Sequence, residues 1–176
     1  MTKSKLIWIT GLSASGKTTL AKKLVKLLRS RNIQVILLDG DDLRDVFGYE
    51  FMNQESHSRE FRLSLSMRYS RLCYNLVIQD FTVVIATISL FKEVQHWNRD
   101  NVPGYFEIYL KTPIEVLRER DPKGIYEGFA RGQIKNVAGL DLKIDEPKNP
   151  DCIIEYDQER SSSDIAAELD KLLRFK

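Results

Sequence analysis

The sequence predicts an α/β fold in which a five-stranded, mainly parallel sheet lies between two layers of helices. Its apolar runs are short and uninterrupted, which is typical of strands covered on both faces. Segments with helical spacing of apolar residues alternate with these runs. Such alternation favours right-handed crossovers and brings ligands to the carboxyl ends of the strands. With 176 residues, the chain has the length of one domain, residues 1–176.

Strands are predicted wherever four or more apolar or β-branched residues follow one another, with a weaker run near the C-terminus. Turn-forming or charged residues bound each run. The runs cover residues 6–9, 35–38, 81–86, 105–110 and 152–154.

Helices are predicted from apolar residues three and four positions apart. One follows the first strand, one precedes the third, one begins after Pro113, and one ends the chain, where Ser161 and Asp164 form a candidate capping box. A further helix is expected to start near Lys92. The apolar positions are Leu20, Leu24, Leu27 and Leu28, then Leu65, Tyr69, Leu72 and Leu76 with Met67 and Cys73, then Ile114, Val116 and Leu117, then Ile165, Leu169, Leu172 and Leu173.

Composition excludes several classes of protein. Apolar residues make up 43% and charged residues 30%, which argues against long disorder and against a membrane-embedded chain. The 27 basic and 25 acidic residues nearly balance, so neither a nucleic-acid polymer nor a membrane surface is expected as a partner. Cys73 and Cys152 are expected to be reduced thiols, and with two histidines a zinc site is not expected. The N-terminus lacks the pattern of a signal peptide, which predicts a cytoplasmic protein.

A phosphate-binding motif follows the first predicted strand. Residues 11–18 match G-x-x-x-x-G-K-[ST] between a strand and a helix. About one chain in a hundred of this length would match by chance, and the context lowers that figure. The motif predicts a three-layer P-loop NTPase sandwich that binds a nucleoside triphosphate, with Lys17 at the β- and γ-phosphates and Thr18 on Mg²⁺. The expected nucleotide-binding residues are Gly11, Ser13, Ala14, Ser15, Gly16, Lys17, Thr18 and Thr19.

Carboxylates follow the second predicted strand. Asp39 is placed to shape the Mg²⁺ shell, and Asp41 to orient an attacking hydroxyl or accept its proton. Arg44, one helical turn later, is placed to pair with an anionic substrate. Asp/Gly clusters also form ordinary turns and helix caps, but the position after strand two of a phosphate-loop fold favours catalysis.

Residues 121–149 show little periodicity and many glycines and charges, so a long loop is expected there. Lys123, Arg131 and Lys135 suit a basic lid, about residues 121–141, that neutralises a transferring phosphate. A solvated charged loop is the simpler alternative.

These motifs resemble the adenylylsulfate kinase family, which transfers the γ-phosphoryl group of MgATP to the ribose 3′-hydroxyl of adenosine 5′-phosphosulfate. The resemblance covers most of the chain and is most specific at residues 120–126 and at Lys135-Asn136. It implies a small-molecule nucleotide acceptor, a closing lid and a possible homodimer. The substrate-binding residues that it implies are Asp41, Arg44, Arg62, Arg68, Ile88, Ser89, Lys123, Lys135, Asn136 and Val137.

The chain departs from the family pattern in the acceptor pocket. The family's Asn on the helix after strand two is Leu65 here, and the aromatic residue that helps to sandwich the acceptor's adenine is Val137. The other face of that sandwich aligns roughly with His57. An aliphatic residue gives up stacking worth about 1 kcal/mol, so the acceptor base need not be adenine. A related branch, the cytidine diphosphoramidate kinases of capsule biosynthesis, phosphorylates a pyrimidine conjugate at the same position.

Some residues admit simpler readings. Ser89 could cap the next helix instead of contacting substrate, and Phe91 could line the pocket or only pack. Packing is expected for Trp97 and a surface position for Arg71. The leading hypothesis is a kinase with Lys17 and Asp41 as catalytic residues; the alternatives are a nucleotide-dependent switch or binding module, and a pseudo-kinase that only binds nucleotide.

Overall fold

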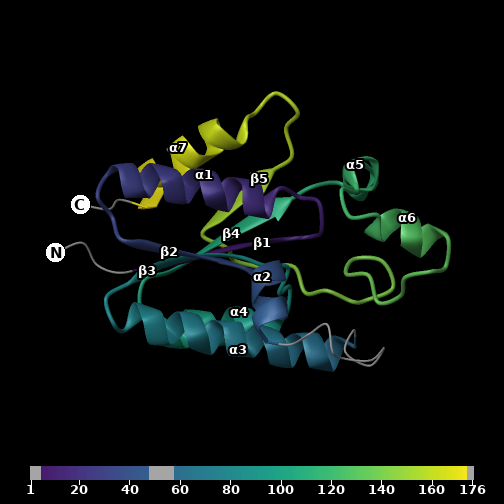
Figure 1. Ribbon diagram of the computed structural model, residues 1–176, viewed down its shortest axis with the longest axis horizontal. Coiled ribbons are helices and arrows are strands. Elements are labelled where there is room, and N and C mark those ends of the chain that lie inside the picture. Colours follow the sequence, from purple (N-terminus) through teal and green to yellow (C-terminus); the bar gives the residue numbers. More distant parts are fainter. Residues whose placement is uncertain (1–4, 48–57, 174–176) are drawn as a thin grey trace.

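A single parallel sheet forms the centre of the computed structural model, which describes residues 5–47 and 58–173 (Figure 1). Its strands run in the order β2-β3-β1-β4-β5, and every neighbouring pair is parallel. The predicted five-stranded sheet is therefore confirmed, and it is entirely parallel. The strands are β1 (Leu6–Gly11), β2 (Val35–Asp39), β3 (Thr82–Ala86), β4 (Tyr105–Lys111) and β5 (Cys152–Glu155).

Helices cover both faces of the sheet. α1 (Lys17–Ser30) and α7 (Ser162–Leu173) lie together on one face, and α3 (Arg59–Val77) and α4 (Lys92–Asn101) lie on the other (Figure 1). Each strand serves both layers, because successive side chains point to opposite faces. On β1, Ile7 and Ile9 pack under α1, whereas Leu6 and Trp8 pack under α3 and α4. This arrangement explains why the strand is apolar at every position.

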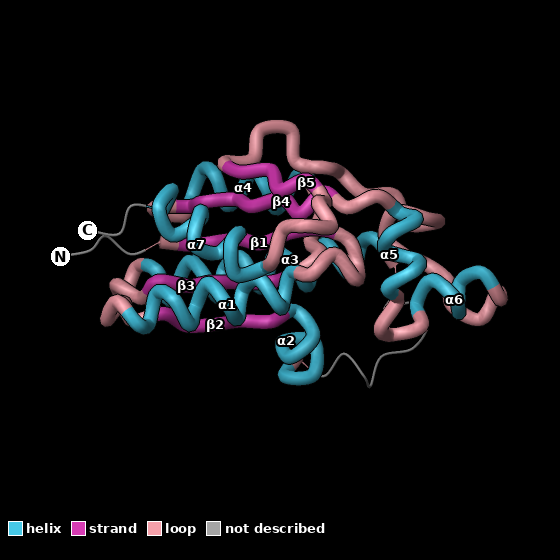
Figure 2. The backbone as a smooth tube through the Cα atoms, turned by 90° about the horizontal axis from the view of Figure 1, so that it is seen from above, coloured by secondary structure: helices cyan, strands magenta, loops and turns pink. Residues whose placement is uncertain are grey.

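Three short helices gather at the carboxyl ends of the strands (Figure 2). They are α2 (Gly40–Val46), α5 (Ile114–Arg120) and α6 (Ile125–Ala130). The expectation of an uninterrupted loop from residue 121 is wrong, because α6 lies within it. The Asp121 carboxylate stabilises the start of this helix, accepting from the backbone N–H groups of Ile125 at 2.8 Å and Glu127 at 2.9 Å.

Several local predictions are confirmed. α4 begins at Lys92, and Ser161 and Asp164 exchange the hydrogen bonds of a capping box at α7. Trp97 packs against Tyr74, and Arg71 is exposed. Neither cysteine forms a disulfide; Cys73 is fully buried and Cys152 half-buried.

Among the helices of the described residues, none has the length and apolarity needed to cross a bilayer.

Candidate active site

The phosphate loop connects the end of β1 to the start of α1. Gly16 precedes the helix with φ 94°, a left-handed conformation that glycine adopts without strain. At Gly11, a Cβ atom would lie 2.7 Å from the Leu110 carbonyl oxygen, so only glycine permits this approach of β1 to β4. Of the other predicted loop residues, Ser15 is buried, Ser13 and Ala14 are half-buried, and Thr19 is exposed on α1.

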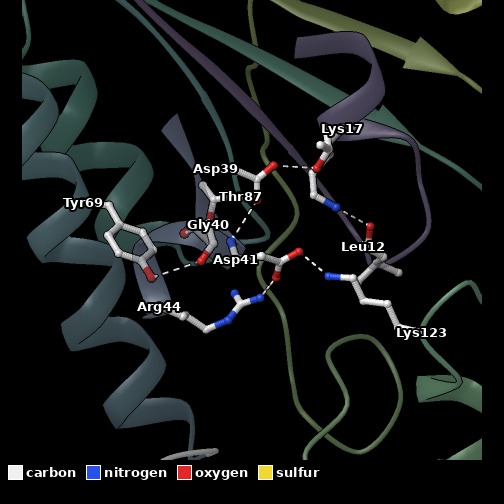
Figure 3. A network of polar contacts seen from close by, with 11 residues as sticks. Leu12, Lys17, Asp39, Gly40, Asp41, Arg44, Tyr69, Thr87 and Lys123 are labelled. Atoms are coloured by element: carbon white, nitrogen blue, oxygen red, sulfur yellow. Dashed lines mark hydrogen bonds and ion pairs between the residues drawn. The ribbon is translucent and has the colours of Figure 1, made fainter. Parts of the chain in front are cut away.

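Lys17 points back over the phosphate loop (Figure 3). Its Nζ donates to the Leu12 carbonyl oxygen at 2.6 Å and to Ser15 Oγ at 3.4 Å. Burial, the largest cause, lowers the pKa of Lys17 to about 7, with Asp39 opposing the shift and the nearby cations Lys123 and Arg44 adding to it. A bound phosphate would supply the negative charge that this ammonium group lacks.

Asp39 holds two parts of the site together. Its Oδ2 accepts from Thr18 Oγ1 at 2.7 Å, and its Oδ1 accepts from the backbone N–H of Asp41 at 2.9 Å, which caps α2. The structural and catalytic readings of this aspartate are thus compatible. A hydroxyl and a carboxylate at this separation fit Mg²⁺, which binds few protein oxygens and keeps waters and phosphate oxygens as its other ligands.

Asp41, at the start of α2, faces the segment between α5 and α6 (Figure 3). Its carboxylate pairs with Arg44 on the next turn of α2 and with Lys123, 82 residues away between α5 and α6. Two cations therefore stabilise the charge of this carboxylate. Burial and the neighbouring Arg44 lower the pKa of Lys123.

A cavity of about 750 Å³ opens beside Arg44, the ion-pair partner of Asp41. Its wall carries three cations, Arg44, Arg62 and Lys135, and no acidic residue of the described part of the chain lines it. An anionic ligand would meet complementary charge there. Of the predicted site residues, Ser13, Arg44, Arg62, Ile88, Ser89, Lys135, Asn136 and Val137 line this cavity.

Three of the predicted substrate residues, Asp41, Lys123 and Arg68, do not line the cavity. Lys123 contacts Asp41 instead, and Arg68 is exposed on α3. Arg131, a predicted lid cation, pairs with Glu127 at 2.5 Å on the exposed face of α6. His57 lies outside the described residues.

Val137 forms part of the cavity wall and is 5% exposed. It packs with Leu117 and Tyr126. Asp141 fixes the turn around it, accepting from the backbone N–H groups of Asn136 at 2.8 Å and Val137 at 2.6 Å. Phe91 both lines the cavity and packs in the core beneath α4, so its two readings are compatible.

Segment 121–141 is anchored to the rest of the site. Tyr126 donates from its hydroxyl to the Ser13 carbonyl oxygen of the phosphate loop at 3.0 Å. Arg62 on α3 donates to the Asn136 carbonyl oxygen at 3.0 Å. The segment therefore connects the phosphate loop to the cavity.

Ser89 does not cap α4. Its hydroxyl lies 2.8 Å from Thr87 Oγ1 and donates to Ser66 Oγ at 2.8 Å. Sequence reasoning did not predict Ser66 or Thr87 as site residues and assigned Tyr69 only to the apolar face of a helix, although all three line the cavity. One signal was present for Ser66, because it and Ser70 are serines four residues apart on the otherwise apolar face of a helix.

Comparisons with known proteins agree with this geometry. A family model described as adenylylsulphate kinase matches residues 3–155. The cytidine diphosphoramidate kinase of Campylobacter jejuni subsp. jejuni serotype O:2 is 34% identical over 143 residues, which cover 81% of each chain. A probable adenylyl-sulfate kinase of Pyrococcus abyssi is 35% identical over 163 residues, 93% of this chain and 90% of that protein.

Solved structures point the same way. The APS kinase CysC of Mycobacterium tuberculosis, solved with AMPPNP and APS, superposes with a TM-score of 0.87 at 30% identity, over 98% of this chain and 99% of that one. The family match spans the phosphate loop, Asp39, Asp41 and the cavity. This chain therefore belongs to the adenylylsulphate kinase family and is an ATP-dependent kinase.

Proposed function

We propose that the protein transfers the γ-phosphoryl group of MgATP to the ribose 3′-hydroxyl of a nucleoside 5′-phospho-conjugate. The observation that carries the proposal is the position of Asp41. On one side Asp41 pairs with Lys123, near the phosphate loop. On the other side it pairs with Arg44, which lines the cavity. A carboxylate at this boundary is suited to orient the ribose hydroxyl of the acceptor as it attacks the γ-phosphate of ATP.

The chain's own residues divide the work. The phosphate loop and Lys17 bind the triphosphate, while Arg44, Arg62 and Lys135 hold the anionic 5′-substituent of the acceptor. Asp41 orients the 3′-hydroxyl and takes its proton as the new oxygen–phosphorus bond forms and the β–γ bridging bond breaks, releasing ADP. Thr18 and Asp39 would hold Mg²⁺, which when bound supplies positive charge to the phosphates. Lys123, released from Asp41, neutralises charge on the transferring group.

Adenosine 5′-phosphosulfate is the first candidate acceptor. It is the substrate that the family's name implies, and the relative from Pyrococcus abyssi carries that name. Cytidine diphosphoramidate is the second, favoured by Val137 at the cavity wall and by the name of the relative from Campylobacter jejuni. Both conjugates are anions, as the cavity's charge requires.

The test is a coupled assay of ADP release with MgATP that compares these two acceptors at low micromolar concentrations, with NMR to locate the new phosphate. We expect acceptor-dependent ADP release and a 3′-phosphorylated product, both absent from Lys17→Ala. Slow hydrolysis that no nucleotide acceptor accelerates would instead favour a nucleotide-dependent switch. Closure of segment 121–141 as a lid, a homodimer and a cytoplasmic location remain predictions of the resemblance and the composition.

A further inference from the structure

Three buried hydroxyl groups form a chain along the cavity wall. Thr87 and Ser89 follow β3, and Ser66 faces them from α3. Thr87 Oγ1 lies 2.8 Å from Ser89 Oγ, which lies 2.8 Å from Ser66 Oγ. All three residues line the cavity, and each is no more than 5% exposed.

The chain has a direction, because each hydroxyl carries one proton. Ser89 donates to Ser66, so Thr87 must donate to Ser89. Ser66 Oγ accepts this bond and keeps its own proton, for which the described residues provide no acceptor. The chain therefore ends in a hydrogen-bond donor at the cavity wall, and each bond in the chain polarises the next.

The backbone holds this chain in place before any ligand binds. Ser89 has φ 28°, a strained conformation for a residue other than glycine. Two contacts to β1 maintain it: the Thr87 N–H donates to the Ile9 carbonyl oxygen at 3.0 Å, and Thr10 Oγ1 donates to the Ile88 carbonyl oxygen. The hydroxyls thus lose their conformational entropy when the protein folds, and ligand binding does not have to order them.

The surroundings of this donor indicate its ligand. Leu65 and Val137 supply aliphatic walls, which offer a base less stacking than the aromatic Phe91 and Tyr69 elsewhere on the wall, so a base beside Leu65 and Val137 depends more on polar contacts. A pyrimidine offers an exocyclic carbonyl oxygen at C2, which projects from the ring toward a donor in the wall, whereas the acceptors of adenine are nitrogens within its rings.

We infer that the Thr87–Ser89–Ser66 chain donates to the C2 carbonyl oxygen of a pyrimidine base on the acceptor nucleotide. These residues then determine specificity in the reaction, and the inference rests on the proposed function. A substrate that satisfies the terminal hydroxyl is favoured over one that leaves it unpaired at the cavity wall.

The test uses two acceptors that differ only in the base, cytidine 5′-diphosphoramidate and adenosine 5′-diphosphoramidate. Ser66→Ala should lower kcat/KM for the cytidine conjugate about tenfold and leave the adenosine conjugate nearly unchanged. Ser70→Ala is the matched control, since Ser70 lies one turn further along α3, is fully buried and does not line the cavity. It should affect both conjugates equally.

A 2-thiocytidine conjugate tests the contact at the level of one atom, because sulfur accepts hydrogen bonds weakly. It should lower the wild-type kcat/KM about as much as Ser66→Ala does, and the two changes together should cost little more than either alone. Equal losses for both bases in Ser66→Ala, or a wild-type preference for the adenosine conjugate, would overturn the inference while leaving 3′-phosphorylation intact. If no nucleotide conjugate were phosphorylated at all, the proposed function itself would fail.

Discussion

The hydroxyl of Thr18 donates a hydrogen bond to Oδ2 of Asp39 at 2.7 Å, which joins the first turn of α1 to the last residue of β2. The other carboxylate oxygen accepts from the Asp41 backbone, so Asp39 cannot rotate without uncapping α2. The pair thus presents two oxygen atoms in a fixed orientation beside the phosphate loop. This geometry suits a cation whose remaining ligands come from phosphate and water.

Asp39→Asn should raise the Mg²⁺ concentration for half-maximal activity by about tenfold, because one charged oxygen near the cation becomes neutral. Asparagine caps a helix as well as aspartate does, so α2 should persist. The measurement is ADP release at fixed ATP across a Mg²⁺ titration. Asp42→Asn, at an exposed neighbouring position, serves as the control. An unchanged Mg²⁺ requirement in Asp39→Asn would separate this carboxylate from the metal.

ATP binding should take up a proton through Lys17. In the free protein the pKa of Lys17 is lowered from 10.5 to about 7, so at about pH 8 most of this side chain is neutral. Phosphate favours the charged form, which raises the pKa again on binding. ATP affinity should therefore fall as the pH rises above about 7, and proton uptake should vanish well below that pH.

Calorimetry of ATP binding in buffers of different ionisation enthalpy measures this uptake. Lys17→Arg should bind without it, because arginine stays charged. The pKa of Lys123 is lowered too, so Lys123→Ala measures how much of the proton uptake comes from that lysine. Most of the uptake should remain in this variant. Equal uptake by wild type and Lys17→Arg would assign the proton to another group.

Asp41→Asn should lower kcat at least about a hundredfold while changing the Kd for ATP much less, because in the proposed mechanism the lost group takes the proton of the acceptor hydroxyl. Asp42→Asn removes the same charge one residue away and should leave both values close to wild type. Stopped-flow turnover and equilibrium ATP binding separate the two effects. The reverse pattern, weak ATP binding with normal turnover, would assign Asp41 to the nucleotide.

Features that depend on local sequence could be predicted from the sequence. The uninterrupted apolar runs predicted the strands correctly, because a parallel sheet buries both faces of each strand. On β1, Leu6 and Ile7 are buried on opposite faces. The phosphate loop and the Asp39 cap are also local, since their residue types fix the backbone conformation.

Features that arise from distant contacts could not be predicted in the same way. Lys123 reaches Asp41 only because the turn after α5 lies against the start of α2, and α6 forms in a segment without apolar periodicity because Asp121 binds its first N–H groups. The role of Ser66 depends on a strained turn at Ser89, 23 residues away. Neither helix periodicity nor residue type indicates such a pairing.

A buried acidic group lies away from the site, under α4. Glu107 on β4 is 3% exposed, and its Oε1 has no partner among the described residues. Arg99 lies 3.8 Å from Oε2 but pairs more closely with Asp151, at 2.8 Å. Burial therefore dominates and raises the pKa of Glu107 above 4.5, although Tyr105 and Arg99 oppose the shift and Asp151 adds to it.

Glu107→Gln should stabilise the protein near neutral pH. Because the folded-state pKa of Glu107 is raised, the folded protein binds the proton more tightly than the unfolded chain does. The ionised form then costs stability above the folded pKa, and this cost disappears as the pH falls below the unfolded value. The variant should thus gain about 1 kcal/mol in the free energy of unfolding at neutral pH, and the gain should shrink as the solution is acidified. Urea unfolding across a pH series measures it, with exposed Glu155→Gln as the control. A loss of stability in Glu107→Gln at neutral pH would show instead that Arg99 holds the carboxylate ionised as a net stabilising pair.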